Sequence, residues 1–293
     1  MKTLAKLVIV HISPILLLSC MDSQENYLTA NQNSEECASD GETTYICGLM
    51  NAEDLISVAG TDFIITTGMA SSALTDDEEV NGHIYLINTE DDSWEALVSK
   101  PSFSQELNGA LYPECPGPLN VQNYSAHGLS LKTKSAEVYD LFITSHGVRE
   151  AIEMFELDLS SGSASLKWTG CVPLDESIMH NSVAILNDGG VVTTQFMTCS
   201  GGLESVVSGQ ARGSVVEWHP AGARSIMAGT ELSGPNGIAV SDDEKYMYVA
   251  AIGTRTIARF DLSQGNERAV SEVLDSNPDN LRWGRTGNCL LYT

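Results

Sequence analysis

The sequence predicts an all-β fold built as a β-propeller, and two observations lead to this prediction. Five segments open with a residue that bears a side-chain oxygen or nitrogen and continue as strand-forming residues. The five openings are Glu53, His127, Asn181, Asn236 and Asp279. They lie 74, 54, 55 and 43 residues apart, and recurrence of a small β unit about every 40–50 residues is typical of propellers. Short strands separated by turn residues also fill the units, four to a unit, as in propeller blades.

Each of the first four units contains four predicted strands. They span 55–59, 62–69, 82–88 and 93–98; 129–132, 139–144, 151–159 and 164–168; 183–186, 190–196, 213–219 and 224–227; and 238–240, 246–252, 256–262 and 269–274. Residues 152–159 alternate between apolar and polar, which is the pattern of a half-buried strand. A β-sandwich is the alternative fold, but it does not predict the same kind of polar residue at the start of every unit.

Two insertions, 100–123 and 198–212, are longer than the turns of a blade. Each contains a candidate helical stretch, at 103–111 and 203–210. Loops of this length in a compact domain are often lids or binding loops. A surface insertion without a function is the alternative, and the sequence leaves both open.

The fifth unit begins at Asp279 and the sequence stops at Thr293, with no sixth unit after it. An unclosed ring leaves exposed strand edges, which propellers avoid. We therefore expect a truncated sequence that lacks most of the last one or two blades. The alternative is that residues 42–49 and another chain help to close the ring.

The N-terminus predicts export. A basic start with Lys2 and Lys6 precedes a mostly apolar stretch at 7–18, and a small residue, Ser19, precedes Cys20. This is the layout of a secretory signal, and the apolar stretch is too short to span a membrane. The letters Leu-Leu-Ser-Cys also resemble the bacterial lipobox, in which the cysteine is lipidated. An ordinary signal peptide with a chance cysteine is the alternative.

These features divide the chain into three parts. We predict a lipoprotein-type signal peptide at 1–19, a polar and flexible tether at 20–46, and the propeller at 47–293. The predicted lipid anchor is on Cys20. Met21 stands where an Asp would favour inner-membrane retention, so we expect an outer-membrane protein that faces the periplasm of a Gram-negative bacterium.

The charge of the chain restricts its partners. The formal net charge is −24, and removal of 1–19 takes away two lysines and no acid, which leaves −26. Such a field repels nucleic acid and attracts cations, and the sequence has no basic stripe of the kind that nucleic-acid binding needs. We expect no nucleic-acid partner.

Six cysteines besides Cys20 are compatible with disulfides in an oxidising compartment. They are Cys37, Cys47, Cys115, Cys171, Cys199 and Cys289. Six cysteines allow 15 pairings, and none are spaced as CxxC, so a zinc or redox site is not expected. We favour a pair between Cys115 and Cys171, because both lie in loops near segments predicted at the end of the channel.

The five opening residues also predict a metal site. In a propeller the innermost strand of every blade starts at the same end of a central channel, so these residues should converge. Glu, Asn and Asp oxygens are ligands that Ca²⁺ prefers. The alternative is that Asn and Asp only start strands as turn residues.

Six ordered motifs resemble the paraoxonase (arylesterase) family and the wider gluconolactonase, regucalcin and luciferin-regenerating-enzyme superfamily, over about residues 47–293. The motifs are Asn-Ala-Glu53-Asp54-Leu, Ala-His127-Gly128-Leu, Ser145-His146-Gly147, Asn181-Ser-Val-Ala, Gly-Pro-Asn236-Gly-Ile-Ala-Val-Ser and Pro-Asp279-Asn280-Leu-Arg-Trp. The resemblance implies a six-bladed propeller with a calcium ion at one mouth of its channel.

The resemblance also implies roles for individual residues. The calcium ligands would be Glu53, Asn181, Asn236, Asp279 and Asn280. His127 and His146 would form a general-base pair that activates water, and His180 is a weaker candidate for lining the pocket. A second calcium would use Asp54, but its other aspartate in the family is Ser182 here, which leaves that second site open.

We therefore predict calcium-dependent hydrolysis of small-molecule lactones or aryl esters. The sequence contains no Gly-x-Ser-x-Gly elbow, His-Glu-x-x-His motif or P-loop that would indicate a serine hydrolase, a zincin or an NTPase. One alternative is a non-catalytic, surface-anchored binding propeller that uses calcium for rigidity, and another is an inactive truncated fragment. The substrate and the oligomeric state stay open.

Overall fold

The computed structural model describes residues 41–42, 45–70, 82–207, 209, 213–220, 222–284 and 289–293. The predicted signal peptide at 1–19, Cys20 and most of the predicted tether lie outside these residues. No helix in the described part of the chain is long and apolar enough to cross a membrane.

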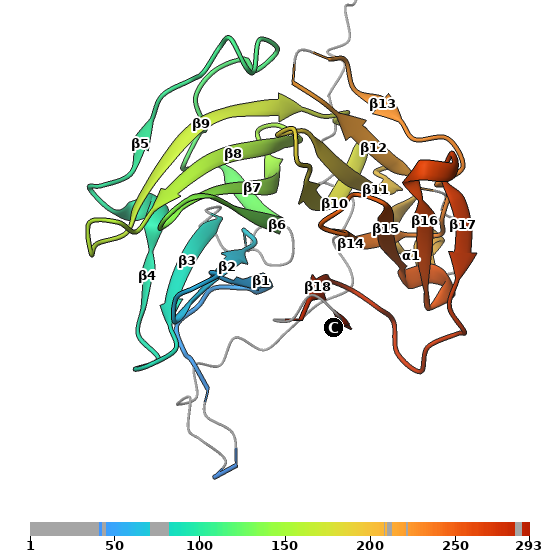
Figure 1. The fold of residues 1–293 in the computed structure, drawn as a ribbon, viewed down its shortest axis with the longest axis horizontal. Helices are drawn as coiled ribbons and strands as arrows, with labels where there is room; N and C mark the ends of the chain where they lie inside the picture. The colour runs from blue at the N-terminus through green and yellow to red at the C-terminus, as the bar shows by residue number, and fades with distance from the viewer. Residues whose placement is uncertain are drawn as a thin grey trace, which may run out of the picture.

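The structure is all-β and propeller-like, as predicted. Four sheets of four or five strands follow one another around an arc, and a two-stranded sheet completes the series (Figure 1). Blade 1 contains β1 (Ala52–Ser57), β2 (Phe63–Gly68), β3 (His83–Asn88) and β4 (Trp94–Ala96); blade 2 contains β5 (Ser104–Gln105), β6 (Tyr124–Ser135), β7 (Val138–Gly147), β8 (Ala151–Asp158) and β9 (Ser165–Pro173). Blade 3 contains β10 (Ile178–Ile185), β11 (Val191–Thr198), β12 (Val215–Trp218) and β13 (Ser225–Ile226); blade 4 contains β14 (Pro235–Val240), β15 (Tyr246–Ala251), β16 (Thr256–Asp261) and β17 (Glu267–Val270).

The fifth unit consists of β18 (Leu281–Trp283) and β19 (Leu290–Tyr292). Four short helices accompany the blades among the described residues: η3 (Leu97–Ser99), α1 (Gly202–Val207), η4 (Ile252–Thr254) and η5 (Leu262–Gln264). Each blade is a chain-order antiparallel meander, except that β5 pairs in parallel with the outer edge of β9. In the first four units, the four strands of each meander correspond closely to the four strands predicted from the sequence.

The first meander strands of the units, β1, β6, β10, β14 and β18, are the inner strands of the arc, and each contacts the next. Two glycines allow this close approach. A Cβ added to Gly128 would lie 2.4 Å from the Asn181 carbonyl oxygen, and one added to Gly237 would lie 2.4 Å from the Asp279 carbonyl oxygen. A side chain at either position would therefore collide with the backbone of the next inner strand.

We expect Gly128→Ala to lower the free energy of unfolding by about 1–3 kcal/mol, the usual cost of overpacking in a close-packed interior. The clash is with backbone atoms of Asn181 and Ser182, which cannot rotate away as a side chain can. Chemical denaturation measures the effect. Gly109→Ala is the matched control, because nothing lies within 4 Å of a Cβ there; equal stability of the two variants would contradict the argument.

Apolar residues fill the interior of each blade and the wedges between blades. The largest cluster joins blades 1, 2 and 3 and includes Ile65, Phe155 and Trp168. A second cluster joins blades 3 and 4 through residues such as Val215 and Phe260. The blades are thus held face to face by apolar packing, which keeps the inner strands at defined positions.

The first insertion differs from its predicted helix. Residues 103–111 form β5, which pairs with β9, and turns. The Gln105 side chain also accepts from the Leu119 N–H (2.7 Å) and donates to the Leu119 carbonyl (3.2 Å). Tyr112 is buried and stacks on Trp218 of blade 3, with ring centroids 5.8 Å apart. The insertion is therefore packed into the outer part of blades 2 and 3.

The cysteine prediction is confirmed by a disulfide between Cys115 and Cys171, which ties this insertion to β9. Cys47 and Cys199 are also in disulfides, and Cys289 is a free, exposed thiol. In the second insertion, the predicted helical stretch at 203–210 corresponds to α1, in which Val206 packs against Phe196 and Met197.

Candidate metal centre and active site

The opening residue of each of the first four units lies at a β-bulge in an inner strand. The pairing register shifts between Ala52 and Asp54, between Ala126 and Leu129, between His180 and Val183, and between Pro235 and Ile238. These four interruptions contain Glu53, His127, Asn181 and Asn236. A bulge bends its strand and redirects side chains, so the same local irregularity turns all four residues toward one end of the channel.

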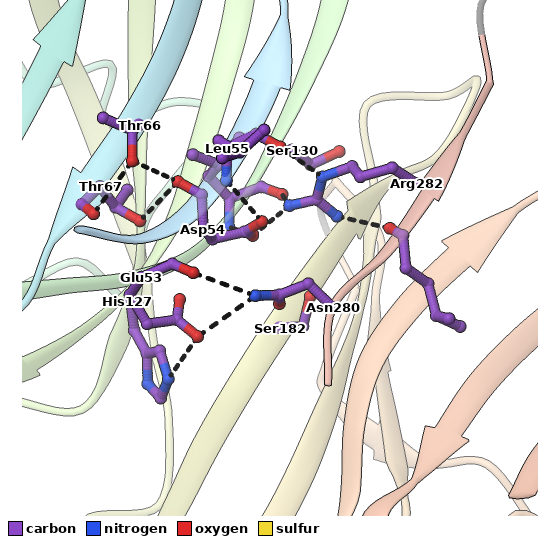
Figure 2. A network of polar contacts seen from close by, with 12 residues as sticks. Glu53, Asp54, Leu55, Thr66, Thr67, His127, Ser130, Ser182, Asn280 and Arg282 are labelled. Carbon is purple, nitrogen blue, oxygen red and sulfur yellow. Dashed lines mark hydrogen bonds and ion pairs between the residues drawn. The ribbon is translucent and has the colours of Figure 1, made fainter. Parts of the chain in front are cut away.

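The fifth unit brings Asp279 and Asn280 to the same place. The Asp279 carbonyl accepts from the Gly237 N–H at 2.9 Å, which attaches this segment to β14. On the other side, the Asn280 amide nitrogen lies 3.2 Å from the Glu53 carbonyl oxygen and 3.4 Å from its Oε1 atom (Figure 2). The structure therefore places first and last units side by side at the predicted site.

Four side-chain oxygen atoms of the candidate metal ligands, here called the oxygen group, are buried and lack a hydrogen-bond partner. They are Glu53 Oε2, Asn181 Oδ1, Asn236 Oδ1 and Asn280 Oδ1. A buried polar atom without a partner costs about 1–3 kcal/mol, so four at one place require an explanation. A bound cation would satisfy all four, and the residues present therefore fit a metal ion.

The type of donor favours calcium over a transition metal. No group of three or more His, Cys, Asp or Glu side chains in the described residues is arranged to hold a metal. The candidate set instead combines amide oxygens with the carboxylates of Glu53 and Asp279. Ca²⁺ accepts amide and carboxylate oxygens in irregular geometry, whereas zinc prefers nitrogen and sulfur ligands.

The two carboxylates of the group influence each other. Burial raises the pKa of Asp279, and the neighbouring Glu53 carboxylate raises it further. Burial also acts to raise the pKa of Glu53, but the charge and hydrogen bond of His127 outweigh it, so the pKa lies below its ordinary value. Two carboxylates buried at one place repel each other when both are ionised, and a cation bound between them would offset this repulsion.

His127 and His146 form a contiguous pair. The Nδ1 atom of His127 lies 2.7 Å from Nε2 of His146. The other nitrogen of His127 faces the oxygen group, 3.4 Å from Glu53 Oε1 and 3.3 Å from the Asn181 amide nitrogen. His127 is 6% exposed and His146 is 1% exposed, so the pair is largely shielded from bulk water.

Glu150, a residue that the sequence analysis missed, continues this chain of contacts. Its Oε1 atom lies 2.7 Å from His146 Nδ1. Burial acts against ionisation, but the charges and hydrogen bonds of His146 and His180 lower the pKa of Glu150 to about 2. The sequence does carry a signal for it: Glu150 is an acidic residue four positions after the candidate histidine His146, in the predicted turn between the strands at 139–144 and 151–159. His180 is buried, 3.8 Å from Glu150 Oε2.

Asp54, the expected ligand of a second calcium, is paired with Arg282 instead. Its Oδ1 atom accepts from the Leu55 N–H at 2.8 Å, and its Oδ2 atom accepts from the Leu129 N–H at 2.9 Å and from Arg282 (Figure 2). Burial and the Glu53 carboxylate raise the pKa of Asp54 to about 6, against the effect of Arg282. Because both oxygens have partners and a guanidinium is already present, these residues do not fit a second metal ion.

A cavity lies at the other end of the channel. It has a volume of about 1020 Å³ and is lined by the later residues of the inner strands, such as Leu131, Ile185 and Val240. None of the five candidate metal ligands and neither candidate histidine lines it. Arg282 lines this cavity, and its partner Asp54 directly follows Glu53 in the chain, so the cavity is a feature separate from the candidate metal centre.

Comparison with known proteins adds independent information. The family model described as Arylesterase matches residues 50–291. The chain is similar to the solved structure of a luciferin-regenerating enzyme, with 14% sequence identity, a TM-score of 0.50, and coverage of 84% of this chain and 70% of that one. It is also similar to a protein assigned as a gluconolactonase, with 16% identity, a TM-score of 0.47, and coverage of 81% and 70%. A search of curated protein sequences gives no significant match.

Proposed function

The chain belongs to the arylesterase family, and from this membership and the oxygen group at the channel mouth we propose that it is a calcium-dependent hydrolase of lactones or aryl esters. The observation that carries the proposal is the set of four buried, unpartnered oxygens of Glu53, Asn181, Asn236 and Asn280. They lie beside a histidine pair that could activate water. A metal centre next to a base is the arrangement that metal-assisted ester hydrolysis needs.

In this proposal Glu53, Asn181, Asn236, Asp279 and Asn280 hold the calcium ion. Bound Ca²⁺ would polarise the carbonyl group of the substrate as a Lewis acid and stabilise the negative charge that develops on its oxygen. Glu53 and Asp279 together supply two negative charges, which balance the charge of the ion. The neutral amides complete the coordination without excess negative charge that would repel a developing oxyanion.

His127 is the general base. When its Nε2 atom takes a proton from water, the resulting imidazolium has an acceptor for each N–H: His146 Nε2 at 2.7 Å and Glu53 Oε1 at 3.4 Å. Burial acts to lower the pKa of His127, but the Glu53 carboxylate outweighs it and raises the pKa above its ordinary value. The surroundings therefore support the charged form that proton abstraction creates.

The proposal is tested by hydrolysis of a small lactone and of phenyl acetate, with added calcium and with a chelator. We expect chelation to abolish turnover, and we expect the double variant Asn236→Ala, Asp279→Ala to lose both turnover and the rise in melting temperature that calcium causes in the wild type. The matched control is Asn88→Ala, Asp91→Ala, which removes one Asn at the end of β3 and one Asp in the exposed turn after it, each of which accepts a backbone hydrogen bond.

The outcomes separate the alternatives. Turnover that is indifferent to chelation would contradict the calcium mechanism. A calcium-dependent rise in melting temperature without turnover of any lactone or ester would instead indicate a binding propeller. A ring of six blades, truncation, the lipid anchor on Cys20 and the outer-membrane location stay predictions of the sequence.

A further inference from the structure

We propose that Glu150 is the positioning residue of the histidine pair. Its carboxylate determines which ring nitrogen of His146 carries hydrogen, and His146 in turn determines which ring nitrogen of His127 does so. The inference concerns the metal-free protein directly. Only its consequence for turnover rests on the proposed hydrolase function.

The first step is the contact between Glu150 and His146. An ionised carboxylate has no hydrogen to donate, and the low pKa of Glu150 keeps it ionised across the neutral range. The 2.7 Å contact to His146 Nδ1 therefore requires the hydrogen to be on Nδ1. Both side chains are buried, at 7% and 1% exposed, so bulk water does not compete for this hydrogen bond.

The second step passes the orientation to His127. With hydrogen on Nδ1, the Nε2 atom of neutral His146 has a lone pair and can only accept. The His127 Nδ1 atom, 2.7 Å away, must then be the donor. In the neutral pair, the Nε2 atom of His127 is left with its lone pair directed at the oxygen group, which is the form that a general base requires.

The third step concerns Asn181. A lone pair on His127 Nε2 accepts from the Asn181 amide nitrogen at 3.3 Å. The Asn181 Oδ1 atom is therefore turned away from the histidine, and it is one of the four unpartnered oxygens. One buried carboxylate thus accounts for the direction of three successive contacts, from Glu150 to a candidate metal ligand.

The test is nitrogen NMR of the metal-free protein with ¹⁵N-labelled histidine, recorded at a pH above the raised pKa of His127 so that the rings are neutral, where the two neutral forms of each ring can be distinguished. In the wild type we expect His127 and His146 to carry hydrogen on Nδ1. In Glu150→Gln, whose amide can donate as well as accept, we expect His146 and His127 to shift partly or fully to hydrogen on Nε2. His219 is the internal control, because it pairs with Asp188 at 2.6 Å on the surface and should be unchanged in Glu150→Gln.

The same variant is then assayed with calcium. We expect kcat to fall about 10–100-fold, which is the typical effect of removing a residue that orients a ligand or a base through a hydrogen bond. KM and the calcium-dependent rise in melting temperature should be retained. Glu150→Asp keeps the carboxylate and should recover part of the loss in kcat. If the glutamine variant fails to fold, Glu150→Met, which removes the carboxylate at similar side-chain size, replaces it in both measurements.

Two results would overturn the inference: unchanged histidine forms in Glu150→Gln, or full kcat in that variant. If Glu150→Met is used in its place, unchanged histidine forms or full kcat in that variant would overturn the inference in the same way. If the wild type turns over no lactone or ester, the proposed function fails while the NMR result still decides the role of Glu150.

Discussion

Replacing Arg282 by methionine should lower the free energy of unfolding by about 3–5 kcal/mol, the usual cost of leaving one member of a buried ion pair without its partner. The Asp54 side chain is 1% exposed, so its charge cannot be solvated in place. Arg282 also donates to the Leu55 carbonyl at 3.1 Å and to the Leu129 carbonyl at 3.0 Å. Its loss therefore also removes hydrogen bonds to two other inner strands, β1 and β6.

The loss should depend on pH with a defined sign. The pKa of Asp54 in the folded protein is about 6, above its ordinary value of 3.8, so the native state takes up this proton more readily than the unfolded chain does. Without Arg282 that pKa should rise further, because the guanidinium is what favours the charged form. The stability difference between wild type and Arg282→Met should then be largest near pH 8 and shrink toward pH 5, where Asp54 is protonated in both proteins.

Chemical denaturation at the two pH values measures this effect. Arg268→Met is the matched control, since Arg268 lies exposed on β17 and donates to the Glu231 carbonyl at 3.0 Å. An Arg282→Met variant as stable as Arg268→Met would show that β18 is not held to the first blade by this pair. A difference that grew toward pH 5 would contradict the assigned state of Asp54.

Replacing His127 by glutamine should reduce kcat/KM for a lactone or aryl ester by about 10²–10⁴, the range that a positioned general base contributes. Glutamine can still hydrogen-bond to Glu53 or Asn181, but it cannot take the proton from water. Calcium binding should be retained, because His127 is not among the candidate ligands. Hydrolysis assays and the calcium-dependent melting temperature together measure the two expectations.

The control for this variant is His219→Gln, a histidine that also pairs with a carboxylate but lies 47% exposed at the surface. It should leave both measurements unchanged. Full activity of His127→Gln would assign the base to another group. Loss of calcium binding in the same variant would place His127 among the metal ligands.

Local patterns in the sequence were sufficient for the architecture of the blades. Alternation of apolar and polar residues and the spacing of turns depend only on neighbours in the chain, so the strands of four units, such as β8 and β16, could be predicted closely. The stretch at 103–111, a candidate helix from the sequence, is not helical. There, β5 pairs with β9 and the side chain of Gln105 binds Leu119, 14 residues away; such long-range contacts outweigh a local helical preference.

The chemistry of the site could also be predicted in part. The sequence identified the polar residue at the start of each inner strand, and ring geometry implied that these residues converge, which the structure shows for Glu53, His127, Asn181 and Asn280. It did not predict the β-bulges that turn them inward, because a bulge is a property of the pairing between two strands.

What the sequence determined by itself is the repeated β unit, the oxygen-rich opening of each unit and the acidic charge of the chain. Only the tertiary structure decided that Glu150 contacts His146 and that Asp54 pairs with Arg282, 228 residues later in the chain. The physical reason is that both contacts join side chains whose positions depend on the packing of whole strands. Periodicity and residue chemistry report on neighbours in the chain, whereas a buried charge acquires its partner only when the first and last inner strands meet.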